Sequence, residues 1–301
     1  MPVKINPGGP GERHALLMCP PTYYSADKVR NLWMEEMTLE ERMIDGPKAL
    51  AQFEQVRQAI AALATVRLMP ARPGLAEQVF TAEIGFVPAG PQDVVIMADD
   101  GTPRGELAAG RHYLQSLGLR TLTPPGRFGG QGDIRHVRDN LYVGGYGEST
   151  EPAVFSWLSE EFDLRIIGIE EVDPYLYGVE NIILPIRNDE MLVCTELLNI
   201  SELRDISDLS NIIDVSVDLC YGGICSSIIL SETVFNSDNL SVLETGSDEY
   251  LLELAKNETL ARICRDRGLD LQLLETGEFS KSGALLTSLT MDLGDLGAGL
   301  E

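Results

Sequence analysis

EFSKSGALLTSLTM, residues 278–291, is the most informative segment of the chain. An apolar run from Ala284 to Leu289 follows a glycine, and the residues before that glycine suit a helical turn. A short apolar run bounded in this way predicts a buried strand. We therefore expect this segment to lie inside the folded protein.

The segment also resembles the C-terminal signature of the guanidine-modifying enzymes, the dimethylarginine dimethylaminohydrolase and amidinotransferase superfamily. The family pattern runs roughly Glu-Phe-x-Lys-Ser-Gly-Gly-small-apolar-His-Cys-apolar-Thr, and its cysteine attacks the guanidinium carbon of the substrate. Residues 278–283 match the first six positions, but Ser288 stands at the cysteine and Thr287 at the histidine before it. The resemblance implies a pentein fold, a five-bladed α/β propeller built from ββαβ modules.

Two motifs in the first half of the chain extend this resemblance. Phe-Thr-Ala-Glu, which ends at Glu83, is similar to the family's Phe-Thr-Ala-Asn. Residues 128–133, Phe-Gly-Gly-Gln-Gly-Asp, are similar to Phe-Glu-Gly-x-Gly-Asp. Asp133 is therefore retained, whereas Gly129 replaces the acidic residue that the resemblance assigns to holding the guanidinium.

Two later motifs carry further replacements. Residues 145–150 match Gly-Tyr-Gly-x-Arg-Ser/Thr, but Ser149 replaces the arginine that commonly binds a substrate carboxylate. Residues 174–181 resemble the segment Tyr-His-Leu-Asp-Thr. There Gly178 aligns with the histidine that acts as general acid and base, and Glu180 aligns with the aspartate that contacts substrate.

Two other segments have both a structural and a functional interpretation. Arg104 opens a predicted helix at a family Arg-x-Glu whose arginine can reach the substrate, although a solvated helix end explains it equally well. An aromatic loop from Tyr23 to Trp33 resembles the family's first loop, with Leu32 replacing a proline. The resemblance implies a lid near the site, and the simpler interpretation is an aromatic cluster that anchors a loop.

The chain repeats the order strand, strand, helix, strand about five times, which suits a propeller. We expect one pentein domain over residues 13–293, with flexible ends at 1–12 and 294–301. An amphipathic helix is predicted to start near Pro47, and Ser149 or Thr150 is predicted to cap a helix that runs to Phe162.

The acidic composition limits the classes of molecule that the protein is expected to bind. The 301 residues carry a net charge of −24, from Asp+Glu 47 and Lys+Arg 23. Such a surface repels phosphate backbones and anionic lipid, so nucleic acid and membranes are poor candidate partners. A cationic small molecule or a basic protein is more compatible. No apolar run is long enough to cross a bilayer, and the first ten residues do not suit a signal peptide.

Cysteine usage predicts reduced thiols in a cytoplasmic protein. The cysteines number five, an odd count, and they have apolar neighbours and no repeated Cys-x-x-Cys pair. They are Cys19, Cys194, Cys220, Cys225 and Cys264. Packing is the favoured role, because a second pair to complete a zinc site with Cys220 and Cys225 is missing. Neither a metal nor a cofactor is expected.

Guanidine modification by this family requires a thiolate nucleophile, a histidine to carry protons and carboxylates to hold the cation. Ser288 supplies only a weak nucleophile and Gly178 supplies no base. The histidines are His14, His112 and His136, and none has the required position. We therefore expect no catalytic residues at the degenerate positions Ser288, Gly178 and Gly129. A binding role is expected instead for the set Glu83, Arg104, Asp133, Glu180 and Ser288.

The favoured hypothesis is a family member that has lost guanidine chemistry and acts by binding a partner protein or a cationic small ligand. The ribosomal anti-association factors give this fold a non-enzymatic precedent. The alternative is an active hydrolase or amidinotransferase that uses Ser288 or a metal held by the acidic residues. A further alternative is an accessory subunit of an active homologue, and a homo- or hetero-oligomer fits either binding role.

Overall fold

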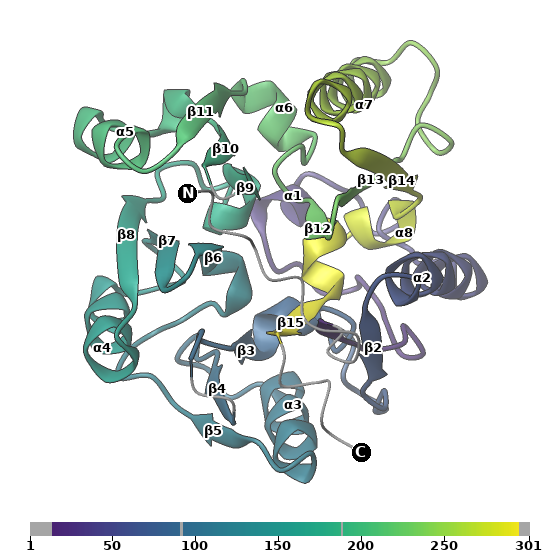
Figure 1. Ribbon diagram of the computed structural model, residues 1–301. Helices are drawn as coiled ribbons and strands as arrows, with labels where there is room; N and C mark the ends of the chain where they lie inside the picture. The colour runs from purple at the N-terminus through teal and green to yellow at the C-terminus, as the bar shows by residue number, and fades with distance from the viewer. Residues whose placement is uncertain (1–13, 91–92, 188, 295–301) are drawn as a thin grey trace.

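Five three-stranded sheets are arranged around one axis in the computed structural model, which describes residues 14–90, 93–187 and 189–294 (Figure 1). The blade built from β6 (Ile134–Arg138), β7 (Leu141–Tyr146), α4 (Pro152–Phe162) and β8 (Arg165–Glu170) shows the plan. Its inner strand β6 is antiparallel to β7, and β7 is parallel to β8 across the helix. Each blade is therefore a ββαβ module, as the sequence predicts.

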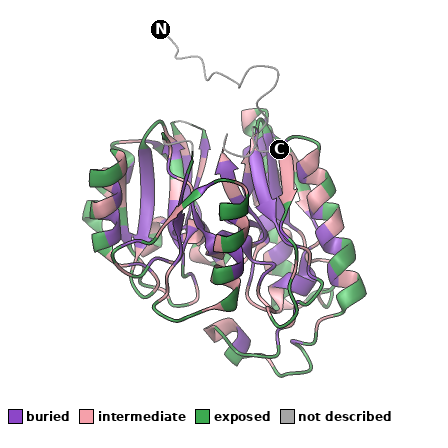
Figure 2. Cartoon of the chain, turned by 90° about the horizontal axis from the view of Figure 1, so that it is seen from below, coloured by how far each residue is buried: buried purple, intermediate pink, exposed green. Residues whose placement is uncertain are grey.

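The other blades have the same order of elements. They are β3 (Gly85–Phe86), β4 (Val94–Met97), α3 (Gly105–Ser116), β5 (Arg120–Leu122); β9 (Ile183–Arg187), β10 (Glu190–Val193), α5 (Ile200–Ser207), β11 (Asn211–Asp214); and β12 (Ile228–Leu230), β13 (Thr233–Ser237), α7 (Asp248–Arg267), β14 (Asp270–Leu274). The helices α3, α4, α5 and α7 lie on the outside of the ring with their exposed faces outward, and the middle strand of each blade is buried (Figures 1 and 2).

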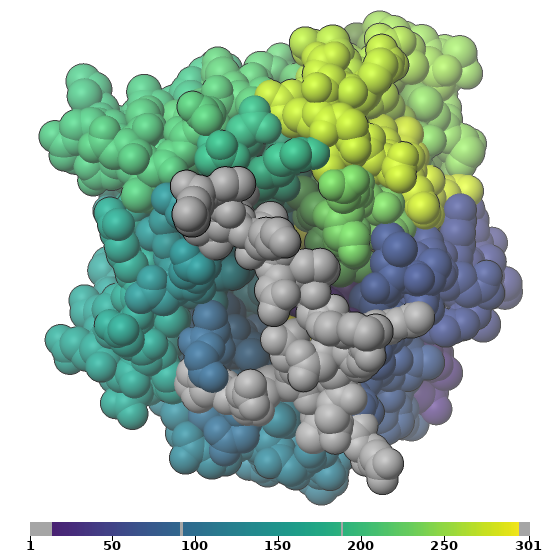
Figure 3. All heavy atoms as spheres, viewed as in Figure 1, coloured from purple at the N-terminus to yellow at the C-terminus, as the bar shows by residue number. Residues whose placement is uncertain are grey.

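The fifth blade joins the two ends of the described chain. Strand β15 (Met291–Gly294) pairs antiparallel with β1 (Ala15–Met18), which pairs parallel with β2 (Thr65–Leu68) across α2 (Gly46–Ala61). Figure 3 shows the yellow C-terminal part of the chain against the blue N-terminal part. This pairing closes the ring, because it places the first and the last strand of the described chain in one blade.

Apolar side chains fill the space between neighbouring blades. Phe53 of α2, Phe235 of β13 and Phe279 of α8 (Gly277–Ser280) belong to one such cluster and are almost fully buried. Burying a side chain of this size contributes about 1.5–3 kcal/mol. The cluster holds the last blade of the chain against the closing one.

Short 3₁₀ turns stand before four of the five inner strands. They are η1 (Thr81–Ile84), η2 (Gln131–Asp133), η3 (Val179–Asn181) and η5 (Leu286–Leu289). Turn η1 packs against both η5 and η2, and η2 packs against η3. Residues from distant motifs therefore meet near the axis, at the end where the inner strands begin.

The prediction of a strand at residues 284–289 is wrong. Leu286–Leu289 form η5, in which the Ser288 N–H donates to the Leu285 carbonyl, and the strand begins only at Met291. Periodicity cannot separate a buried strand from a buried turn over so short an apolar run. Burial of the run is confirmed, since Leu286 and Leu289 are fully buried.

The predicted cap of α4 is also wrong. Glu151 occupies the N-cap position without a side-chain cap bond, and the hydroxyls of Ser149 and Thr150 bind Asp133 instead. Helix α2 begins at Gly46, and Asp45 caps it by accepting from the Lys48 N–H.

The expected flexible ends lie largely outside the described residues, although Gly294 belongs to β15. In the part of the chain that the structure describes, no helix is long and apolar enough to span a bilayer.

Candidate functional site

Glu83, Asp133 and Glu180 come together near the axis because each lies in one of the converging turns. The negative charge of Glu83 contributes to raising the pKa of both other carboxyls, so the three groups are within electrostatic reach of one another. Ser288 lies in η5, which packs on the turn that holds Glu83. The axis end therefore gathers residues that are far apart in the sequence.

Asp133 is the most constrained of these groups. Its Oδ2 accepts from the Ser149 hydroxyl at 2.6 Å and from the Thr150 hydroxyl at 2.5 Å. Burial raises the pKa of Asp133, and these two hydrogen bonds oppose the rise. Asp133 is thus held in place by the motif in which the family pattern has an arginine.

The space beside Gly129 is already occupied. A Cβ added there would overlap Oδ2 of Asp133 and would lie 3.2 Å from Cβ of Ser149. A carboxylate side chain at position 129, as in the family pattern, cannot enter without displacing Asp133. The replacement at this position therefore accompanies a changed packing.

Gly178 adopts φ 83° and ψ 123°, a backbone conformation that L side chains rarely take. An added Cβ would lie 3.2 Å from the Gly132 carbonyl and 3.5 Å from Oδ1 of Asp133. A histidine at this position would be strained whatever space surrounds it. The backbone itself is therefore unsuited to the family's acid and base.

Glu171 is a buried acid that the sequence analysis missed. Burial, and then the charge of Asp133, raise the pKa of Glu171 to about 8, and a hydrogen bond from the Gly178 N–H opposes that rise. Its Oε1 has no hydrogen-bond partner among the described residues. Its only signal in the sequence is an acidic residue just after a predicted strand and before the Gly178 motif.

Glu180 is only 7% exposed, and its Oε2 has no hydrogen-bond partner among residues 14–90, 93–187 and 189–294. Burial raises the pKa of Glu180, while the positive charge of Arg135 opposes the rise. Arg135 is a second residue that the sequence analysis missed, because it lies outside every family motif. Its positive charge lies within electrostatic reach of Glu180.

Arg104 forms ion pairs with three acidic residues. Its guanidinium lies 2.7 Å from Glu83, 3.4 Å from Glu77 and 3.6 Å from Asp100. Only 19% of its side chain is exposed, so the interpretation as a solvated helix end is wrong. Its charge offsets that of Glu83, which leaves Asp133, Glu171 and Glu180 as the less compensated acids.

The aromatic loop is anchored to two segments that adjoin the site, as its structural interpretation predicts, and its role as a lid stays a prediction. Tyr24 anchors it by donating to or accepting from the Ser282 hydroxyl at 2.7 Å. Further along, Asn31 donates to the Ser282 carbonyl at 2.8 Å and to the Tyr177 hydroxyl at 3.1 Å. Trp33 donates to the Tyr175 carbonyl at 2.9 Å. The loop thus bridges the C-terminal motif and the segment before Gly178.

No histidine of the described chain is hydrogen-bonded to Ser288. Ser288 is half-buried, and its backbone N–H donates to the Leu285 carbonyl. His14 pairs with Asp292, and His136 bonds to the Asp139 carbonyl. His112 lies in α3 on the outside of the ring.

The thiols do not replace the missing nucleophile. All five cysteines are free and buried. Burial raises the pKa of Cys19 to about 12, and a hydrogen bond to Cys220 followed by burial raises that of Cys194. A thiol with a raised pKa is a poor nucleophile. Within the described residues, no group of three or more histidine, cysteine and acidic side chains could hold a metal ion.

This propeller, with its turns meeting at one axis end, defines the class: the chain has the pentein fold of the guanidine-modifying enzymes. The N-terminal domain of ArgZ, an arginine dihydrolase from cyanobacteria, matches it with a TM-score of 0.80 at 20% identity, over 93% of this chain and 97% of that one. A DDAH from Pseudomonas aeruginosa in complex with citrulline matches with a TM-score of 0.69 at 16% identity, over 93% and 99%.

The similar proteins found by sequence are particular arginine enzymes. The bifunctional arginine dihydrolase/ornithine cyclodeaminase ArgZ of Synechocystis is 26% identical over 183 residues, 59% of this chain and 25% of the relative. AgrE of Nostoc, described in the same words, is 27% identical over 183 residues, 60% and 26%. The chain thus spans about a quarter of the length of these relatives. No family model matches the chain.

The pentein fold and the likeness to guanidine-modifying enzymes are therefore confirmed. Loss of catalysis and the roles of individual side chains stay predictions.

Proposed function

We propose that this protein binds a small guanidinium or amine cation of the arginine type at the carboxylates of the axis end, without breaking a bond in it. The observation that carries the proposal is the replacement of the family's histidine by Gly178 in a backbone conformation reserved for glycine. The site is remodelled around this glycine, so restoring one side chain does not restore the chemistry.

The acids support a cationic ligand. Glu171 and Glu180 each have a buried oxygen without a hydrogen-bond partner among the described residues. A buried carboxylate that lacks a donor costs free energy, and a cation with several N–H groups supplies charge-assisted bonds to it. The net charge of −24 also favours the approach of a cation.

The arginine type is supported by the similar proteins. ArgZ and AgrE are described as arginine dihydrolases, and AgrE has been solved in a binary complex with L-arginine. If the chain keeps the ligand class of these proteins, a guanidinium is the cation that its carboxylates hold.

The absence of hydrolysis follows from what the reaction needs. Attack on a guanidinium carbon requires an activated nucleophile, and Ser288 has a hydroxyl without a histidine to take its proton. Carboxylates can orient a cation, but orientation alone does not supply the nucleophile or the proton donor for the leaving amine.

A second candidate is an active arginine hydrolase or amidinotransferase with unusual chemistry. The comparisons favour it, because the similar proteins of described function are arginine enzymes. In this case Ser288 is the nucleophile, and a buried acid such as Glu171, with a pKa raised to about 8, takes its proton. Roles as an accessory subunit or as a partner of another protein stay predictions.

The test compares L-arginine with L-citrulline, in which a neutral urea group replaces the guanidinium. We expect arginine to bind in isothermal titration calorimetry and citrulline to bind at least tenfold more weakly, because the carboxylates select charge. Glu180→Gln should weaken arginine binding about tenfold. The matched control is Glu232→Gln, which makes the same change at an exposed position.

The same samples decide between the two candidates. Citrulline or ornithine released from arginine by the wild-type protein, and lost in Ser288→Ala, would establish the hydrolase. If arginine and citrulline bound with equal affinity, or if neither bound, the proposal of a cationic ligand would be wrong.

A further inference from the structure

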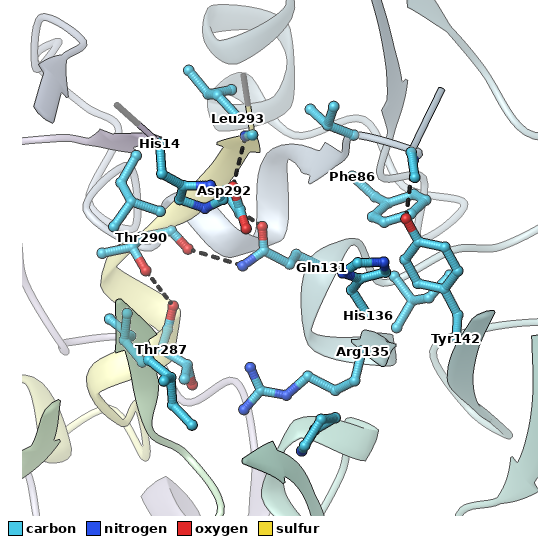
Figure 4. Close-up of a pocket in the computed structure, with 18 of the residues that line it drawn as sticks. His14, Phe86, Gln131, Arg135, His136, Tyr142, Thr287, Thr290, Asp292 and Leu293 are labelled. Atoms are coloured by element: carbon cyan, nitrogen blue, oxygen red, sulfur yellow. Dashed lines mark hydrogen bonds and ion pairs between the residues drawn. The ribbon is translucent and has the colours of Figure 1, made fainter. Parts of the chain in front are cut away.

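A cavity of about 690 Å³ lies along the axis, away from the carboxylates (Figure 4). The inner strands β3, β6, β9, β12 and β15 all contribute to its wall. Each of the turns that carry Glu83, Asp133 and Glu180 precedes an inner strand, and the cavity is lined further along those strands. None of these three acids lines it. The cavity is therefore distinct from the site formed by these acids. Its polar lining includes Arg135, Thr287 and Gln131.

Most of the wall is apolar. Phe86, Leu184, Ile229, Leu230 and Leu293 come from four of the five blades and line the same space. A cavity of this size, in which apolar residues outnumber polar ones, has the character of a small-molecule site. Its occupant must present hydrocarbon to most of the lining.

Arg135 is the polar group that decides the ligand's charge. Its guanidinium points into the middle of the cavity toward Thr287 (Figure 4). One of its nitrogens, Nη2, donates to the Cys225 carbonyl at 3.0 Å. Its Nε is buried and has no hydrogen-bond partner among the described residues. This cation is therefore only partly satisfied by the protein.

Neighbouring acids do not neutralise it. Arg135 forms no ion pair within the described chain. Glu180 is the carboxyl that acts on it most, but no hydrogen bond or ion pair joins the two side chains in the described structure. Asp292 also lines the cavity, but it is held by His14 at 2.7 Å and by the Gly294 N–H at 2.6 Å. An anion from outside is the missing partner of Arg135.

We propose that this cavity is a second ligand site, which takes a small amphipathic monocarboxylate with its carboxylate on Arg135 and its hydrocarbon against the apolar wall. A carboxylate matches the planar donor edge of a guanidinium. The site is independent of the function proposed for the axis carboxylates, and it attracts a ligand of the opposite charge.

The probe is octanoate, compared with 1-octanol and octylammonium, each titrated well below its aggregation concentration. We expect one octanoate to bind per chain, octanol to bind at least tenfold more weakly, and octylammonium not to bind. Arg135→Gln should weaken octanoate at least tenfold and leave octanol unchanged, because it removes the charge and keeps the wall. Arg120→Gln, at an exposed position, is the matched control.

Val87→Trp places a bulky side chain in the cavity wall and leaves Arg135 in place, so it should weaken octanoate and octanol by the same factor. If Arg135→Gln does not fold, Val87→Trp and the comparison of head groups still decide the proposal. Equal affinities for octanoate and octanol, wild-type affinity for octanoate in folded Arg135→Gln, or no binding to the wild-type protein would each overturn it.

Discussion

Gly178 and Gly129 show at the residue scale that the axis end differs from the family pattern in more than its missing side chains. Gly178 has a backbone that excludes most side chains, and Asp133 fills the space beside Gly129. Side-chain replacements alone could be reversed by mutation, whereas a changed backbone and changed packing resist reversal. This distinction gives the first prediction.

Ser288→Cys should form no citrulline from arginine or dimethylarginine. The thiol gains no histidine, and proton transfer alone is typically worth about 10²–10⁴-fold. Adding Gly178→His, Gly129→Glu and Ser149→Arg should still give no activity, because the first strains the backbone and the second overlaps Asp133. Citrulline assays of each variant are the measurement, and turnover by Ser288→Cys alone would show a far more intact site.

Gly178→His should also lower the free energy of unfolding by about 1–3 kcal/mol, the cost of holding a non-glycine residue at such a φ. Gly46→His is the matched control, since Gly46 has open space around it and an ordinary φ. Urea unfolding of the two variants separates backbone strain from the general effect of an added imidazole. Equal stabilities would contradict the prediction.

Glu171 gives a pH dependence whose sign can be worked out. Its pKa is raised from 4.5 to about 8 in the folded protein, so the folded state holds a proton that the unfolded state releases. Between about pH 5 and 8 this group must therefore make stability fall as pH rises, by at most about 1.4 kcal/mol per pH unit. Stability is greatest below the unfolded pKa and its loss is complete above pH 8.

Glu171→Gln mimics the protonated form and should flatten this dependence. Unfolding in urea at several pH values from 5 to 8 measures the slope for the wild-type protein and the variant. Glu232→Gln should keep the wild-type slope, because Glu232 is exposed. Parallel slopes for the wild-type protein and Glu171→Gln would show that Glu171 titrates normally.

At the scale of elements, the aromatic loop is attached to the site by a few side-chain bonds. Trp33 packs edge-on against Tyr175 and Tyr221, at centroid distances of 5.1 and 5.9 Å, and bonds to the Tyr175 carbonyl. Few other contacts of this segment are buried, because most of residues 35–41 are exposed. A segment of this kind opens at lower free energy than the blades.

Trp33→Ala should therefore speed proteolysis within residues 25–45 at least several-fold, with a smaller effect on global unfolding. Limited proteolysis followed by mass spectrometry locates the cuts. Leu39→Ala, at an exposed position within residues 25–45, is the control, and this variant should be cleaved at the wild-type rate. Unchanged cleavage in Trp33→Ala would mean that other contacts hold the loop.

At the scale of the whole molecule, closure of the ring depends on β15. Leu293 is fully buried on this strand, and β15 is the only inner strand paired with β1 in the described structure. Leu293→Ala should lower the free energy of unfolding by about 2–5 kcal/mol, because it leaves a cavity at the closing blade. Leu251→Ala, at an exposed site on α7, should change it far less. Urea unfolding of both variants makes the comparison, and similar losses would mean that closure does not depend on this packing.

The sequence by itself determined the class of fold, the order of the blades and the identities missing from the family pattern. Local patterns suffice there, since α4 ends at Phe162 as predicted. The sequence also suggested which acids would matter, because Glu83, Asp133 and Glu180 lie in recognisable motifs.

Only the tertiary structure decided what surrounds those acids. A short apolar run does not specify strand or turn, so η5 took its form from the contacts at the axis. Glu171 and Arg135 lie outside every motif and acquire their environments from residues far away in the chain. A pKa, a backbone φ at Gly178 and an axial cavity are properties of packing between blades, and packing between distant segments leaves no local pattern in a sequence.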